Sequence, residues 1–168
     1  CAGSGNHGLT ATLPVVAVAE KMNIDREKLI RGVTLSLLVT IYVKSYTGTL
    51  SPVCGCGVAA GVGASAGIAY ILGGNIQQIE GAIKNMIGTL SGIICDGGKP
   101  GCAFKLSISV DAAIECAIMA LKDVVISSID GIVDETAEKS IYNLGKVSTE
   151  GMATTDEAIL GVMMGKCM

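Results

Sequence analysis

Aromatic side chains are scarce in this sequence: they make up 3% of its 168 residues, and tryptophan is absent. A core without large rings has to be filled by small and aliphatic side chains, which favours helices that pack closely with small residues at their crossings. The composition suits such a core, because half of the residues are hydrophobic and 23 are glycine. Length and composition together predict one domain over residues 1–168.

Charged residues are also few, at 16% of the sequence, and their net charge of −3 comes without a basic block. Nucleic acid is therefore a poor candidate partner, since its binding depends on clustered lysine and arginine. The longest uncharged run, Ser45 to Ile79, is long enough to span a membrane and has small residues at packing intervals. Aromatic belts and basic flanks are missing, however. We expect no membrane span, and a buried central helix instead.

The seven cysteines are not preceded by a signal peptide. This odd number, without a secretory signal, favours reduced thiols in a cytoplasmic protein over a disulfide framework. The sequence begins with Cys1 rather than an initiator methionine, so we interpret it as a segment of a longer protein. A homodimer is compatible with these features.

Apolar residues recur at helical spacing between glycine-rich interruptions, which predicts an all-α fold with a single compact domain and a buried Gly/Ala-rich central helix. Asp25 and Asn75 are typical N-cap residues, Gln78 completes a capping box with Asn75, and Thr154 with Glu157 forms another. Gly3 to Gly8 is predicted to be a loop. The predicted helices run from Thr10 or Thr12 to Met22, from Asp25 to Ser45, from Cys56 to Leu72, from Asn75 to Ile94, from Cys102 to Ser128, from Asp134 onward and from Thr154 onward.

Two cysteine motifs, Cys54-Gly-Cys56 and Cys95 to Cys102, set thiols among glycine and proline, where they suit a soft metal. If Cys54, Cys95 and Cys102 hold a [4Fe-4S] cluster, one iron has no protein ligand and is available as a Lewis acid. Cys54 is preferred to Cys56 because it lies just ahead of the glycine-rich helix, whose N-terminus favours a thiolate. If all four bind together, the alternative is a closed structural zinc site in a non-catalytic interaction or regulatory module.

Two further cysteines are not expected to be ligands. Cys116 lies between Ile114 and Ile118 on a predicted helix, which indicates a core position. Cys167 is penultimate and has no supporting motif around it, so we interpret it as a tail thiol.

Four segments together resemble the L-cysteine desulfidase family, which is related to the alpha chain of bacterial iron–sulfur L-serine dehydratase. They are Gly3-Ser-Gly-Asn-His-Gly8-Leu-Thr-Ala-Thr-Leu-Pro14, Cys54-Gly-Cys56, Lys84-Asn-Met-Ile-Gly88 and Ile94-Cys95-Asp-Gly-Gly-Lys-Pro-Gly-Cys102. The resemblance implies a C-terminal catalytic segment with a [4Fe-4S] cluster on Cys95, Cys102 and one cysteine of Cys54-Gly-Cys56.

The implied reaction is a lyase reaction of amino-acid catabolism, β-elimination from L-cysteine or L-serine. Hydrogen sulfide or water leaves, and the aminoacrylate that forms breaks down to pyruvate and ammonia. The expelled group is basic and needs stabilisation, which a Lewis acid supplies. By the same resemblance, the base that removes the α-proton lies in the N-terminal part, outside this chain. We therefore name no catalytic base here and expect the isolated chain to be inactive.

The opening loop is the candidate site for the substrate carboxylate, because its free amides and the following helix N-terminus attract anions. Lys99, in the cysteine loop, is a candidate cation for the same substrate, with Asp96 as a residue that orients it. The alternatives are a structural turn for the loop and a solvated side chain for Lys99. The predicted substrate-binding residues are Ser4, Gly5, Asn6, His7, Thr10 and Lys99.

Overall fold

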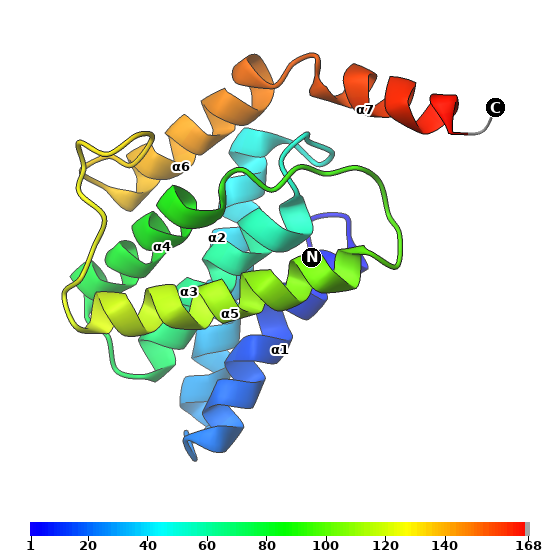
Figure 1. Ribbon diagram of the computed structural model, residues 1–168. Coiled ribbons are helices and arrows are strands. Elements are labelled where there is room, and N and C mark those ends of the chain that lie inside the picture. The colour runs from blue at the N-terminus through cyan, green and yellow to red at the C-terminus, as the bar shows by residue number, and fades with distance from the viewer. Residues whose placement is uncertain (167–168) are drawn as a thin grey trace.

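The computed structural model describes residues 1–166, and regular structure there is helical except for one isolated antiparallel bridge between Val53 and Ile94 (Figure 1). The predicted all-α fold is confirmed. In chain order the elements are α1 (Gly5–Lys21), α2 (Arg26–Thr47), the π-helical turn η1 (Gly55–Ala59), α3 (Ala60–Ile71), α4 (Ile76–Leu90), α5 (Cys102–Leu121), α6 (Ala137–Lys146), the second π-helical turn η2 (Val147–Gly151) and α7 (Thr155–Gly165).

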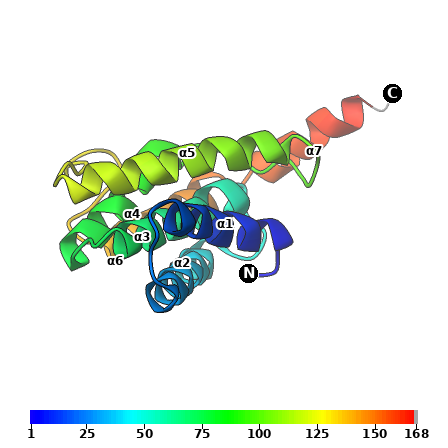
Figure 2. The same cartoon turned by 90° about the horizontal axis from the view of Figure 1, so that it is seen from below.

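The Gly/Ala-rich helix α3 is central and contacts α1, α2, α4 and α5. Figure 2 shows α5 along one side of the molecule and α2 along the other, with α3 between them. All residues of α3 except Tyr70 are buried, as predicted. Its glycines allow a close approach to α2: a Cβ on Gly63 would lie 2.2 Å from Thr40 Oγ1 and 2.3 Å from the Ser36 carbonyl oxygen. Small residues at this crossing therefore bring the two backbones together.

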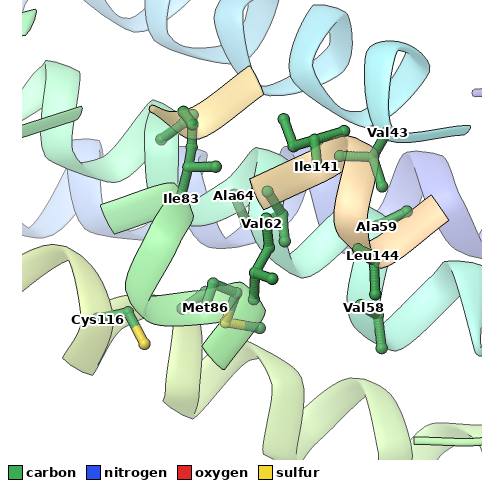
Figure 3. Packing of buried hydrophobic residues seen from close by; sticks show 14 of the residues in the cluster. Val43, Val58, Ala59, Val62, Ala64, Ile83, Met86, Cys116, Ile141 and Leu144 are labelled. Carbon is green, nitrogen blue, oxygen red and sulfur yellow. The ribbon is translucent and has the colours of Figure 1, made fainter. Parts of the chain in front are cut away.

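Aliphatic side chains and methionine fill the core, as the shortage of aromatics predicts. In the larger cluster, Val58 and Val62 lie with Val43 of α2, Met86 of α4 and Leu144 of α6 (Figure 3). A second cluster joins the other end of α3 to α1 and α5. Because both clusters include α3, they position the two ends of that helix against α1, α2, α4 and α5.

The buried face of α2 differs from the one that its apolar periodicity suggests. Ile30, Leu38 and Ile41 are about half exposed, whereas small and polar residues face the core. The reason is the close approach to α3, which only a face of small side chains permits. The buried residues of α2 are Gly32, Ser36, Thr40, Val43, Lys44 and Thr47.

By length and composition alone, α2 could cross a membrane, and 28% of its apolar 18-residue window is buried inside the protein. One such helix is weak evidence for a membrane span. Within residues 1–166, it is the single helix that meets both criteria. The uncharged run from Ser45 to Ile79 is not one span, because it is divided among the end of α2, a loop, the helical stretch Gly55–Ile71 and the start of α4.

The predicted start of the first helix is wrong. Helix α1 begins at Gly5 with Ser4 at its N-cap, so residues 5–8 form its first turn rather than a loop, and Pro14 lies inside the helix. Glycine disfavours helix, but His7 in this turn is 4% exposed, and its burial supplies the tertiary packing that local propensity lacks.

Several helix ends also differ from the prediction. Helix α4 ends at Leu90 because Ile94 pairs with Val53, and α5 ends at Leu121. The segment after α5 is held by buried Asn85, which donates to the Val124 carbonyl at 2.9 Å and accepts from the Ile126 N–H at 2.8 Å. The pattern of apolar residues predicts longer helices, but in these segments the backbone bonds to distant residues instead of continuing the helix.

The predicted helix caps have mixed outcomes. The Asp25 cap and the Asn75–Gln78 capping box are confirmed. Helix α6 begins at Ala137 with Thr136 as its cap, slightly after the predicted start. Helix α7 begins at Thr155, but Thr154 makes no side-chain cap, so the capping box predicted there does not form.

Candidate functional site

A short antiparallel pairing joins the two cysteine motifs. The Cys54 N–H donates to the Ile93 carbonyl at 2.8 Å, and the Cys95 N–H donates to the Pro52 carbonyl at 2.6 Å. These bonds flank the bridge between Val53 and Ile94. Two segments that are distant in sequence are thereby held side by side, immediately before η1 and the loop that leads to α5.

The four cysteines of the two motifs line one cavity of about 200 Å³. Sequence reasoning left open whether these thiols converge, and the structure brings them together. The cavity also receives the start of α1, one residue of α2 and the first turn of α5. Its lining residues are Gly3, Ser4, Asn6, His7, Lys44, Thr49, Leu50, Ser51, Cys54, Gly55, Cys56, Cys95, Asp96, Gly97, Gly98, Cys102 and Lys105.

Of the two cysteines in its motif, Cys54 is the one whose surroundings favour the thiolate. A hydrogen bond with Cys56 is the main cause that lowers the pKa of the Cys54 thiol, to about 6. The Gly57 N–H and the Lys105 charge also lower this pKa, whereas burial raises it. The same pairing raises the pKa of Cys56, whose sulfur lies 3.9 Å from Ser4 Oγ. The two thiols of this motif therefore differ, and Cys54 is the better ligand for a soft metal.

Lys44, which the sequence analysis did not single out, lines the cavity from α2 and is 6% exposed. Its Nζ donates to Ser51 Oγ at 3.3 Å. Burial lowers the pKa of Lys44, while the charges of Cys56, Cys95 and Cys54 oppose this effect. Lys44 follows Ser36 and Thr40 at intervals of four residues, so it lies on the same face of α2, and that spacing could have placed it in the core. The apolar periodicity of α2 instead favoured the other face.

His7 is buried at the same end of the cavity. Its Nδ1 lies 3.2 Å from the Cys1 carbonyl oxygen, which can only accept, so Nδ1 carries the proton and Nε2 is unprotonated in the neutral ring. Burial and the Lys44 charge lower the pKa of His7, which favours that neutral ring. A Cβ on Gly55 would lie 2.4 Å from His7 Nε2 and 3.0 Å from Lys44 Nζ. The missing side chain at Gly55 therefore gives both groups their space.

The predicted carboxylate-binding residues fall into two groups. Ser4, Asn6 and His7 line the cavity at the N-terminus of α1, where Ser4 makes no side-chain cap to the helix amides. Gly5 is exposed, and a Cβ there would meet no atom within 4 Å, so the structure shows no steric need for glycine. Thr10 is buried away from the lining, and its hydroxyl has no hydrogen-bond partner within residues 1–166.

Asp96 is held between two lysines. It pairs with Lys99, as the sequence analysis suggested, and also with Lys105, whose Nζ donates to the Ile94 carbonyl at 2.9 Å. These ion pairs hold the pKa of Asp96 well below its usual range. Lys105 lines the cysteine cavity, whereas Lys99 lines a larger apolar cavity of about 760 Å³ beside α7. Lys105 is thus the lysine of this loop region that reaches the thiols.

The remaining cysteines lie elsewhere. Cys116 is buried beside a separate cavity formed by α4, α5 and the segment after α5, which agrees with a core role. Cys167 lies outside the residues that the structure describes. Within residues 1–166, no three His, Cys, Asp or Glu side chains are placed to share one metal ion.

Comparison with known proteins supports the relationship that the motifs suggest. Residues 1–161 match the family described as serine dehydratase alpha chain. A UPF0597 protein of Clostridium tetani is 66% identical and covers 99% of this chain. UPF0597 proteins of Caldanaerobacter subterraneus and Clostridioides difficile are 58% and 56% identical, over 98% and 96% of this chain.

This chain spans 39%, 39% and 38% of the lengths of those three relatives, respectively. No solved structure matches it. Because the family match covers nearly the whole chain and includes both cysteine motifs, the chain belongs to the serine dehydratase alpha chain family.

Proposed function

We propose that this chain is the cluster-binding part of an iron–sulfur amino-acid lyase, which converts L-cysteine or L-serine to pyruvate and ammonia with release of hydrogen sulfide or water. The observation that carries the proposal is the shared cavity of Cys54, Cys56, Cys95 and Cys102. Family membership supports the general lyase relationship. The L-cysteine desulfidase activity and the cluster are proposed in addition to that relationship.

The residues around the cavity fit a [4Fe-4S] cluster held by Cys54, Cys95 and Cys102. Each of these thiolates would bind a different iron, so they need not meet at one point as they would around a single ion. The ammonium group of Lys105 offsets the negative charge of the Cys54 thiolate. When bound, such a cluster supplies a Lewis-acidic iron whose open position accepts the leaving group.

The chain's own residues would bind and orient the substrate. The uncapped N-terminus of α1 presents backbone N–H groups and a positive dipole end to the cavity, where Ser4 and Asn6 add side-chain donors, whereas the unprotonated Nε2 of His7 can only accept. These groups suit an α-carboxylate. We place the base for the α-proton in the longer protein's remaining part, in line with the chain's 39% share of its relatives.

The proposed setting is the cytoplasm, where free thiols persist and the small amino-acid substrates are available. The expected partner is the rest of the same polypeptide, with a homodimer as an oligomeric form to test. We expect no nucleic acid as a partner, because the sequence has no basic block, and no membrane, because its apolar segments lack aromatic belts and basic flanks.

The deciding experiment uses the full-length protein after anaerobic reconstitution with iron and sulfide. We expect bound iron and acid-labile sulfide, thiolate-to-iron absorbance, and pyruvate from L-cysteine, L-serine or both. Release of sulfide alongside pyruvate from L-cysteine would identify the desulfidase. Stoichiometric zinc with no lyase activity would instead favour the structural-metal module and refute the proposal.

A further inference from the structure

We propose that the Lys44 ammonium binds the α-carboxylate of the substrate, an inference that rests on the proposed function. Lys44 reaches the cysteine cavity from α2 and is 6% exposed. Burying an ammonium group is costly unless hydrogen bonds and an anion compensate it. The position therefore calls for a compensating anion.

Hydrogen bonds and ion pairs within the described part of the protein supply little of that compensation. The Nζ of Lys44 has three N–H donors, and the hydrogen bond given for it goes to Ser51 Oγ at 3.3 Å. The Ser51 hydroxyl gives its own proton to the Val53 carbonyl at 2.8 Å, so its oxygen remains an acceptor for Lys44. No ion pair within residues 1–166 involves Lys44. The carboxylate of the cavity, Asp96, is already paired with Lys99 and Lys105.

The wall of the cavity beside Lys44 has a second feature that attracts a carboxylate. Gly55 has no side chain and so lets Lys44 Nζ and His7 Nε2 approach its backbone, since a Cβ there would lie 3.0 Å and 2.4 Å from them. The start of α1 lines the same cavity and adds its positive dipole end. Lys44 and the helix terminus thus form two independent attractions for one carboxylate.

A second role for Lys44 is charge compensation of the cysteine thiolates, whose charges oppose the lowering of its pKa by burial. The two roles make different predictions. A thiolate partner would make metal binding depend on Lys44. A carboxylate partner would make recognition of the substrate's negative charge depend on it.

The test uses reconstituted full-length protein with Lys44→Met and, in case the apolar replacement misfolds, Lys44→Gln. Lys28→Met, at the opposite end of α2, is the matched control. Iron content, KM and kcat for L-serine and L-cysteine are measured, and calorimetry compares the binding of L-serine with that of L-serinamide, which lacks the carboxylate charge.

We expect wild-type iron content in both Lys44 variants, with KM for L-serine raised about tenfold or more, because a buried charge pair is lost. Binding of L-serinamide should stay the same, and Lys28→Met should match the wild type. An unchanged KM, an equal loss of L-serine and L-serinamide binding, or a loss of iron would overturn the inference. Failure of the proposed function itself would show in the wild type, as no pyruvate from either amino acid.

Discussion

The peptide N–H of Cys95 donates a hydrogen bond of 2.6 Å to the carbonyl oxygen of Pro52. This bond and the neighbouring bridge between Val53 and Ile94 align the two cysteine motifs. The candidate ligands therefore project from loops that are fixed by backbone pairing, while α3 and α5 supply the rigid support behind them. Such an arrangement holds the backbones of Cys54 and Cys95 adjacent.

The first prediction concerns ligation. Cys54→Ser, Cys95→Ser and Cys102→Ser should each abolish stable iron binding after reconstitution, because serine is a poor ligand for iron in a thiolate site. Iron and acid-labile sulfide per chain are the measurements.

Two variants serve as comparisons for the ligand set. Cys116→Ser should retain iron, because Cys116 lies by a different cavity. Cys56→Ser should retain more iron than Cys54→Ser, because the Cys56 thiol has the raised pKa of the pair. Equal iron content in the Cys95, Cys102 and Cys116 variants would refute the assignment.

The second prediction concerns the close packing of side chains around Gly55. Gly55→Ala should lower the free energy of unfolding by about 1–3 kcal/mol, because the added Cβ would displace buried side chains. It would lie 2.4 Å from His7 Nε2 and 3.0 Å from Lys44 Nζ. Denaturant unfolding measures the change, and iron content should fall with it. Gly161→Ala is the control, since a Cβ there meets nothing within 4 Å, and a similar loss in that variant would contradict the steric explanation.

The third prediction uses the Asp134 carboxylate. A hydrogen bond from the Glu135 N–H, followed by smaller effects of Asn143 and Lys139, lowers the pKa of Asp134 in the folded state. Its stabilisation is therefore present above the unfolded pKa of about 3.9 and is lost as the pH falls through the lower folded value.

Asp134→Asn should accordingly lower the Tm at pH 7, and the difference from the wild type should shrink below about pH 4. Thermal unfolding at both pH values checks this. Asp111→Asn, at an exposed position on α5 with no ion pair in residues 1–166, is the control and should leave the Tm at pH 7 close to that of the wild type. A difference for Asp134→Asn that is as large in acid as at neutral pH would contradict the linkage.

The fourth prediction separates cluster binding from catalysis. The 168-residue chain alone should fold and take up iron, since it has its own core and cysteine cavity, but it should not form pyruvate at a useful rate. Adding the rest of the full-length protein, in cis or in trans, should restore the activity. Rapid pyruvate formation by the chain alone would place the α-proton base among residues of this chain, with His7 the first to examine.

Local sequence determined the helical class and several helix boundaries of this protein. The Asp25 cap and the Asn75–Gln78 capping box involve residues three apart, so their hydrogen bonds depend on no distant segment. The shortage of large rings likewise limited the core to small and aliphatic side chains. The cysteine motifs identified the candidate ligands by residue type and spacing.

Tertiary structure decided which faces are buried and which groups meet. The spacing of apolar residues on α2 favoured a face that is largely exposed, because the glycines of α3 admit only the small side chains around Ser36 and Thr40 at close range. The same packing places Lys44 in the cysteine cavity. Burial of a side chain depends on the shape of the surface opposite, which hydrophobic periodicity along one helix does not contain.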